Sequence, residues 1–208
     1  MPRPRIHDDE TREALRTAAE RLFDERGAAG VTVRAVADEV GTTTRAVYSL
    51  FGSRDALLVD AMQVRAYELL ELWLDEQDET SDPARDLVEA GVTIFRRLVV
   101  EHPALFRITF QRVLPEFEPG PEVIAARASS LRRLTAKVGR LEDAGLLVET
   151  PLNQAVVSFQ ALCEGLGNLE MRGAIMRLLP AGQEAEAWRA AFRTLVRGLI
   201  TPSFAEKA

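Results

Sequence analysis

Apolar residues recur three and four positions apart along almost the whole chain, a spacing that predicts helices. In the first segment this pattern gives one continuous stripe, formed by Leu15, Ala18, Ala19, Leu22 and Phe23. Strand signals are nearly absent, since the sequence has no long alternating runs of valine, isoleucine and threonine and no Asn-Gly turn. We therefore expect an all-α fold.

Glycine and proline divide this pattern into about nine helices, because glycine ends helices and proline starts them. Two short helices are expected at 33–40 and 44–50, followed by a long one from Arg54 to about Asp78. The later helices are expected at about 83–101, 103–113, 121–144, 151–172 and 183–201. The two short helices, separated by Gly41, are the unusual part of this layout.

The composition excludes several classes of protein. The chain has 208 residues, 47% of them apolar, which is enough for a substantial core. Its single cysteine and two histidines give no basis for a disulfide framework or a multi-cysteine metal site, so we expect no metal and no cofactor. No apolar stretch approaches the ~20 residues of a membrane span, and the polar start MPRPRIHDDE is unlike a secretory signal. We therefore expect a cytoplasmic protein with no membrane partner.

The net charge of −6 argues at first sight against a nucleic-acid partner. Residues 1–55, however, carry nine arginines against ten acidic residues, so the excess of acid lies mostly in the rest of the chain. A nucleic-acid partner for the N-terminal segment is therefore compatible with the charge distribution.

The two short helices around Gly41 match a helix-turn-helix unit, in which the second helix enters the major groove of DNA. Val36, Ala37 and Val47 supply apolar positions where the two helices can pack together. The second helix begins Thr43-Thr44-Arg45 and has no apolar stripe on its outer side. Short polar side chains and arginine read base edges, so this helix is the candidate recognition helix.

The segment from Ala18 to Met62 resembles the DNA-binding domain of tetracycline-repressor (TetR) family regulators. The matching positions are Leu22-Phe23, Gly27, Thr32-Val33, Gly41, Val47-Tyr48, Phe51, Ser53-Arg54 and Leu57. Two positions depart mildly from the family pattern: Leu50 stands where histidine is usual, and Arg54 where lysine is usual. The resemblance implies a DNA-binding domain over residues 1–52 and a larger helical regulatory and dimerisation domain over 53–208.

For the N-terminal domain, the resemblance also implies a set of DNA contacts. Tyr48 and Arg54 occupy positions where the family contacts phosphates, and Thr32 would cap the first short helix and offer a hydroxyl or N–H to phosphate. Arg45 is the best candidate for a bidentate guanine contact, worth ~1–3 kcal/mol of discrimination. The expected DNA-binding residues are Thr32, Arg34, Thr43, Thr44, Arg45, Tyr48, Ser49 and Arg54. Arg34 is equally well explained as a solvated helix residue.

The last two long helices carry more apolar surface than one packing face requires. In TetR-like proteins the two C-terminal helices form a four-helix dimer interface, so the resemblance implies a homodimer. The expected interface residues are Leu162, Leu166, Trp188, Phe192, Leu195 and Leu199. The alternative is that both helices belong to the core of a single chain.

The resemblance further implies a pocket for a small-molecule effector among the middle helices. Phenylalanines concentrate there, and an aromatic-lined cleft with few polar groups suits an apolar ligand. The candidate lining residues are Phe95, Phe106, Phe110, Gln111, Phe117, Phe159 and Cys163. For any single phenylalanine, and for Cys163, an ordinary core position is the alternative.

Together these features predict a DNA-binding transcriptional regulator: a dimeric repressor that recognises a double-stranded palindromic operator and is released by an apolar effector. The alternative is an all-α adaptor that binds protein partners and has lost DNA readout, against which the retained Arg45, Tyr48 and Arg54 argue. The sequence contains no Ser/His/Asp set, no glycine-rich phosphate loop and no oriented carboxylate pair. We therefore do not expect an enzyme.

Overall fold

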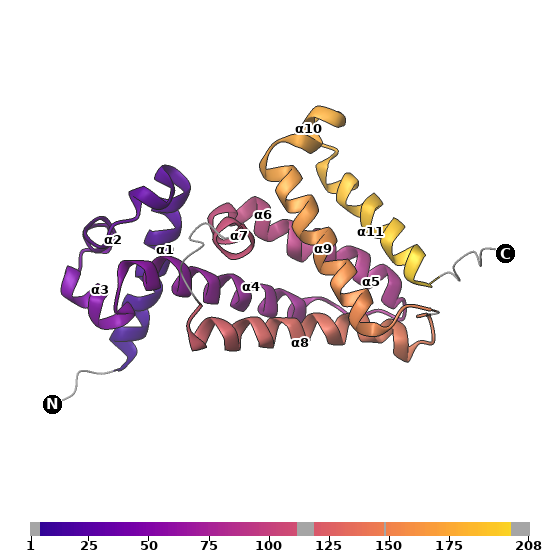
Figure 1. The fold of residues 1–208 in the computed structure, drawn as a ribbon, viewed down its shortest axis with the longest axis horizontal. Helices are drawn as coiled ribbons and strands as arrows, with labels where there is room; N and C mark the ends of the chain where they lie inside the picture. The colour runs from indigo at the N-terminus through magenta and orange to yellow at the C-terminus, as the bar shows by residue number, and fades with distance from the viewer. Residues whose placement is uncertain (1–4, 112–118, 148, 201–208) are drawn as a thin grey trace. The chain divides into compact units, whose positions relative to one another are not determined.

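The computed structural model describes residues 5–111, 119–147 and 149–200, and within them all regular structure is helical (Figure 1). The helices are α1 (Arg5–Gly30), α2 (Val33–Val40), α3 (Thr44–Phe51), α4 (Met62–Glu76), α5 (Pro83–Ala90), α6 (Arg96–Glu101), α7 (Pro103–Phe110), α8 (Pro121–Asp143), α9 (Leu152–Met171), α10 (Ala174–Leu178) and α11 (Glu184–Ile200). Two π-helical segments, η1 (Ala56–Ala61) and η2 (Gly91–Phe95), run directly into α4 and α6. The predicted all-α class is confirmed.

Contacts group the chain into two compact units. The first unit contains residues 1–68 and 102–127, and the second contains residues 69–101 and 128–208. Neither unit is one continuous stretch of chain. The boundaries between the units fall within α4, between α6 and α7, and within α8. The domain boundary expected after residue 52 stays a prediction.

The core of the first unit forms where α1 packs against α2, α3 and α7. Leu15, Leu22 and Phe23 are buried, as the apolar stripe predicts. Gly27 interrupts α1 with φ 68° and ψ −176°, a conformation that glycine adopts without the steric cost of a side chain. The helix is therefore kinked at Gly27, and helical turns continue to Gly30.

Polar contacts also attach α7 to α1. His102, just before α7, places Nδ1 2.6 Å from Oε1 of Glu20. The guanidinium of Arg107 lies 5.0 Å from the centroid of the Phe23 ring, a cation–π contact. Helix α7 thus supports the helix on which α2 and α3 pack.

In the second unit, η2, α9 and α11 share a row of packed aromatic rings. Ring centroids are 5.5 Å apart between Phe95 and Phe159, and 4.8 Å apart between Phe159 and Phe192. Trp188 follows, 6.0 Å from Phe192. A Cβ at Gly91 would come within 2.2 Å of the Phe192 ring, so this close approach of η2 to α11 requires glycine.

A buried carboxylate, Asp86, joins α5 to α8 in the second unit. Its side chain accepts hydrogen bonds from Arg140 at 2.6 Å and from the Thr80 hydroxyl at 2.7 Å. Burial acts to raise the pKa of Asp86, but the hydrogen bonds from Thr80 and Arg140 outweigh it, and the pKa is lowered. The cluster therefore fixes the start of α5 with an ionised carboxylate.

The helices differ from the sequence-based expectation in four places. The expected helices at 54–78 and 83–101 each contain a π-helical segment, which average periodicity does not distinguish from an α-helix. Helix α10 has only five residues, too few for periodicity to predict it. The helix expected at 103–113 is α7, which ends at Phe110, and residues 112–118 lie outside the described part of the chain.

Candidate DNA-binding site

Helix α2 is fixed at both ends. Thr32 Oγ1 accepts the backbone N–H of Ala35 at 3.1 Å, as an N-cap residue does. At the other end, Gly41 has φ 72°, and the N–H of Thr42 donates to the carbonyl oxygen of Ala37 at 2.9 Å, a pairing typical of a Schellman motif. This left-handed conformation favours glycine, so the tight turn between the two helices depends on Gly41.

Helix α3 is capped by Thr43 and anchored by Val47. The Thr43 hydroxyl oxygen accepts the N–H of Ala46 at 3.2 Å. Val47 is fully buried, and α3 packs against both α2 and α1. Because Val47 faces inward, the helical repeat turns the opposite side of α3 to solvent.

The outward face of α3 carries Thr44, Arg45, Tyr48 and Ser49, all of them exposed. Tyr48 is 54% exposed although its ring is large and apolar. Arg45 forms no ion pair or side-chain hydrogen bond with any residue that the structure describes. One guanidinium and three hydroxyl groups are therefore free on one face of a helix, and these groups bind base edges and phosphates.

Arg34 extends this exposed polar surface onto α2. Its side chain is 87% exposed, and Nε lies 3.8 Å from the Asp38 carboxylate, which is itself 72% exposed. Such an exposed pair contributes little to stability. The Arg34 guanidinium therefore remains available to an external partner.

Arg54 differs from the other candidates because its guanidinium is engaged within the first unit. Nε donates to the carbonyl oxygen of Val31 at 2.7 Å, and Nη2 donates to that of Ala28. Nη1 lies 3.0 Å from the carboxylate of Asp55. The residue thus links the chain after α3 to the α1–α2 junction. Sequence patterns missed this role because two of its acceptors are backbone atoms; the phosphate contact of Arg54 stays a prediction.

Two of the candidate ligand-binding residues, Phe106 and Phe110, form an aromatic cluster on α7. Phe106 is buried, and its ring centroid lies 5.3 Å from that of Phe110. Phe110 is half-buried and makes an edge contact with Tyr67, with 6.4 Å between ring centroids. Next to Phe110, the buried hydroxyl oxygen of Thr109 has no hydrogen-bond partner among the described residues. Helix α7 therefore carries the aromatic cluster and, at the position before Phe110, one unsatisfied polar atom.

The remaining ligand-binding candidates lie elsewhere. Phe95, Phe159 and Cys163 belong to the second unit and are buried, in agreement with the alternative of core positions. Burial, together with a neighbouring carboxylate, raises the pKa of the Cys163 thiol well above its ordinary value. Gln111 is exposed, and Phe117 lies outside the described residues. The ligand-binding role of all these residues stays a prediction.

The candidate interface residues divide by burial. Trp188 and Phe192 are fully buried, and Leu199 is 5% exposed, so their side chains belong to the core of the second unit. The leucines that are partly exposed, and so accessible to a partner, are Leu162, Leu166 and Leu195.

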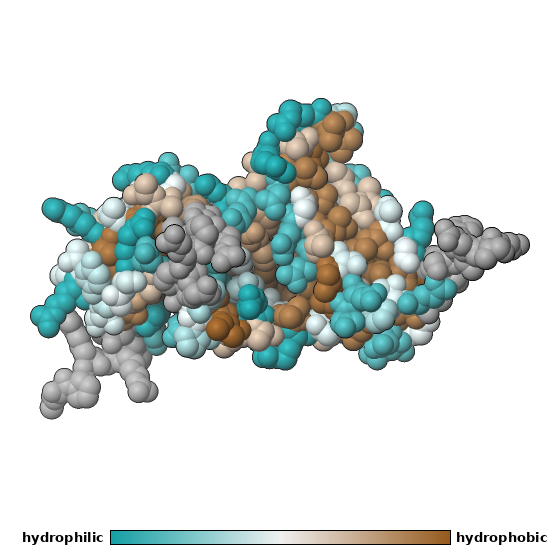
Figure 2. Space-filling view, in the orientation of Figure 1, coloured by the Kyte–Doolittle hydropathy of each residue, from teal (hydrophilic) through white to brown (hydrophobic). Residues whose placement is uncertain are grey.

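Apolar residues also gather on the surface over α9 and α11 (Figure 2). Along α9, Val157 is 65% exposed and Leu169 is 39% exposed. The interface itself stays a prediction, and these exposed positions are the part of α9 that a partner chain would reach.

Metal-ligating clusters and membrane-spanning helices are both missing from the described residues. In residues 5–111, 119–147 and 149–200, no group of three or more histidine, cysteine or acidic residues could hold a metal ion. Within the same ranges, no helix is both long enough and apolar enough to cross a bilayer.

Two family models match the chain. Residues 15–61 match the model of bacterial regulatory proteins of the tetR family, and residues 88–197 match the model of the tetracyclin repressor-like C-terminal domain. No curated protein matches the sequence.

Solved structures share the fold. A protein with unknown function from Rhodococcus sp. RHA1 superposes with a TM-score of 0.72 at 21% identity, over 92% of this chain and 96% of that one. The TetR family transcriptional regulator PfmR from Thermus thermophilus gives 0.62 at 24% identity, over 89% and 98% of the two chains. A regulatory protein of the tetR family from Rhodococcus RHA1 gives 0.65 at 16% identity, over 93% and 98%.

The similarities to solved structures concern the fold alone. The two family models cover the helix-turn-helix and most of the following helical region. The capped helices α2 and α3, with the exposed polar face of α3, lie within the segment that the first family model matches. This chain therefore belongs to the TetR family of DNA-binding transcriptional regulators.

Proposed function

We propose that this regulator is a dimeric repressor that recognises a palindromic operator through α3 and is released by a small, largely apolar effector. The observation that carries the proposal is the outward face of α3. Arg45 and Tyr48 are exposed there, while Val47 anchors the opposite side of the helix. A rigid helix with free polar groups is suited to the major groove.

The exposed candidate residues have distinct chemical roles in this proposal. Arg45 makes a bidentate contact with guanine, and Thr44 and Ser49 contact neighbouring base edges or phosphates. Tyr48 binds a phosphate, and Arg34 contacts a base edge in the groove and brings its positive charge close to the phosphates. The hydroxyls of Thr32 and Thr43 accept cap hydrogen bonds from the backbone, which leaves each O–H proton free for a phosphate oxygen.

A homodimer is proposed because palindromic half-sites require two recognition helices related by a two-fold axis. The exposed side of α9 carries Val157, Ala161, Gly165 and Leu169 at four-residue spacing, so they share one uncharged face. Leu166 flanks this face. Small residues at its centre favour close approach of a second helix, which supports an interface on α9 and α11.

An apolar effector is proposed because of the aromatic cluster in the first unit. Phe106, Phe110 and Tyr67 offer ring surface, and the unsatisfied Thr109 hydroxyl offers one directional hydrogen bond. The effector releases DNA only if it binds more tightly to a conformation in which the two recognition helices are wrongly spaced. Helix α4 is the candidate for transmitting this change, because its residues belong to both units.

We place the protein in the cytoplasm because its DNA target lies there, and we assign it no enzymatic activity. The adaptor alternative makes a different prediction, namely that the chain binds proteins but no specific DNA sequence.

The proposal is tested by footprinting on an operator selected from genomic DNA, together with light scattering of the complex. The expected result is two protected half-sites related by symmetry and one dimer per operator. Addition of an apolar compound that raises the melting temperature should weaken binding, with a coupling of ~1–3 kcal/mol. A single asymmetric footprint bound by one chain would contradict the dimeric part. Operator affinity that every stabilising compound leaves unchanged would contradict the effector part.

A further inference from the structure

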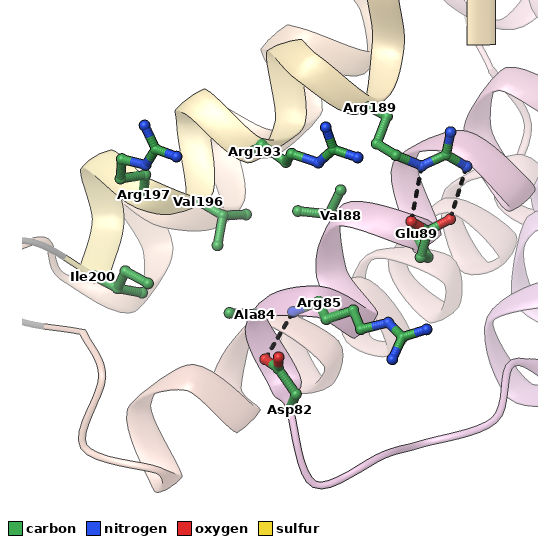
Figure 3. A pocket seen from close by; sticks show the side chains of 10 residues that line it. All are labelled: Asp82, Ala84, Arg85, Val88, Glu89, Arg189, Arg193, Val196, Arg197 and Ile200. Carbon is green, nitrogen blue, oxygen red and sulfur yellow. Dashed lines mark hydrogen bonds and ion pairs between the residues drawn. The ribbon is translucent and has the colours of Figure 1, made fainter. Parts of the chain in front are cut away.

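A groove of about 560 Å³ lies on the second unit between α5 and α11 (Figure 3). Four arginines, two acidic residues and four aliphatic residues line it. It shares no residue with the helix-turn-helix or with the aromatic cluster on α7. Its volume lies within the range of small-molecule sites, about 300–1,000 Å³.

Both acidic residues of the groove are already engaged. The Glu89 carboxylate accepts two hydrogen bonds from Arg189, from Nε at 2.9 Å and from Nη2 at 3.1 Å. The hydrogen bond from Arg189 lowers the pKa of Glu89, and the charges of Arg85 and Arg193 lower it further. Asp82 caps α5 by accepting the N–H of Arg85 at 3.0 Å. The Glu89 carboxylate is therefore ionised, and both acidic residues are committed to partners within the protein.

The remaining cations are less well neutralised. Arg189, Arg193 and Arg197 follow one another at four-residue spacing, so they lie along one side of α11. Arg193 shares the Glu186 carboxylate with Arg189, at 3.0 Å and 3.1 Å respectively. In the described part of the chain, neither Arg85 nor Arg197 forms an ion pair. The groove consequently has an excess of positive charge.

Between these cations the groove is apolar. Figure 3 shows Val88 of α5 and Val196 of α11 facing one another across it. Ile200 and Ala84 extend this surface and are partly exposed. A bound molecule would therefore meet aliphatic side chains next to guanidinium groups that the neighbouring carboxylates neutralise only in part.

We propose that this groove binds a small organic anion that carries an apolar tail. Arg193 and Arg197 hold its carboxylate or phosphate group, and Val196, Ile200 and Ala84 contact the tail. Guanidinium groups suit both kinds of headgroup because they donate parallel hydrogen bonds to two oxygens. The site shares no residue with the effector site proposed above.

Calorimetric titration of the full-length protein tests the proposal. Octanoate and octyl phosphate serve as the two anionic probes, and octan-1-ol, octyltrimethylammonium and inorganic phosphate serve as controls. At least one anionic probe should bind with a Kd below about 1 mM, and every control should bind at least about tenfold more weakly. Octanol that binds as tightly and loses this affinity when Arg193 and Arg197 are replaced would contradict the anionic part. Inorganic phosphate binding as tightly would contradict the apolar part.

Variants locate the site. The double variant Arg193→Gln/Arg197→Gln should lower affinity at least about tenfold, because it removes both guanidinium groups from the anion. Arg132→Gln on α8, an exposed arginine outside the groove, should bind as the wild type does. Unchanged affinity in the double variant would overturn the proposal.

A second substitution covers the case in which the double variant does not fold. Ala84→Glu places a carboxylate inside the groove and in the first turn of α5, where the helix dipole favours negative charge. We expect this variant to keep its melting temperature and to lose one binding site for the anionic probe. An unchanged number of sites would overturn the proposal equally.

Discussion

Nε of Arg54 lies 2.7 Å from the carbonyl oxygen of Val31, so the basic residue that follows α3 is bonded to the chain that precedes α2. A second donor of the same guanidinium bonds the carbonyl oxygen of Ala28. The link holds both ends of the helix-turn-helix through one side chain. A lysine side chain has a single nitrogen, so it does not reproduce these hydrogen bonds from two separate nitrogens.

Arg54→Lys should therefore lower the free energy of unfolding by about 1–2 kcal/mol although it keeps the charge. DNA affinity should fall with it, because α2 and α3 lose a common anchor. Arg26→Lys, at an exposed arginine near the end of α1, is the matched control and should change neither quantity. Chemical denaturation and fluorescence anisotropy measure the two effects. If Arg54 served only to bind phosphate, the lysine variant would unfold like the wild type.

Tyr48→Phe removes a neutral hydroxyl from the outward face of α3. We expect the affinity for all DNA sequences to fall by about threefold to tenfold, which corresponds to one lost hydrogen bond. The salt dependence of binding should stay the same, because no charge has been removed. Arg34→Gln should instead reduce the salt slope by about 1. Loss of affinity on only one sequence would mean that Tyr48 reads a base.

Asp86→Asn should destabilise the protein by about 2–3 kcal/mol at neutral pH, because it breaks a buried ion pair with Arg140. The pKa of Asp86 is lowered in the folded state, so its stabilising contribution is present above the ordinary value near 3.9 and is lost as the pH falls through the folded value. The stability gap between the wild type and the variant should therefore shrink in acid. Asp143→Asn, at an exposed carboxylate, is the control. A difference in unfolding free energy that stays constant down to pH 2 would contradict an ionised Asp86 in the folded protein.

The burial of residues on α9 and α11 predicts two different mutant phenotypes. Leu166→Glu and Leu195→Glu should give folded monomers, because both leucines are partly exposed and a carboxylate there would be buried only in a dimer. Phe192→Ala should instead cost about 3–5 kcal/mol of stability, since that ring is in the core. Light scattering and thermal unfolding separate the two outcomes. Glutamate variants that stay dimeric would place the interface elsewhere.

Much of this fold is predictable from local patterns. Thr32 caps α2 and Gly41 ends it, because capping and left-handed turns depend on one or two residues that the sequence displays directly. Val47 and Phe23 are buried as their helical spacing predicts. Helix positions and helix ends in the DNA-binding region therefore follow from the sequence.

Other features depend on what a side chain meets in three dimensions. Periodicity places Trp188 and Leu195 on one apolar stripe of α11, but Trp188 is fully buried and Leu195 is partly exposed. The apolar stripe of α11 is wider than the part of the helix surface that packs against the core. Periodicity alone therefore does not show which side of the stripe is buried. Arg54 shows the same limit, because its backbone acceptors could be any residue type.

Selection of binding sequences from a random DNA pool tests most directly whether α3 reads DNA. The wild-type protein should enrich an inverted repeat. Arg45→Ala should relax the preference at one base position in each half-site while other positions keep theirs, with a loss of ~1–3 kcal/mol for the preferred base. Arg26→Ala, at an exposed arginine of α1, should enrich the same repeat as the wild type. No enriched sequence, or an Arg45→Ala profile identical to that of the wild type, would contradict recognition of DNA by this face of α3.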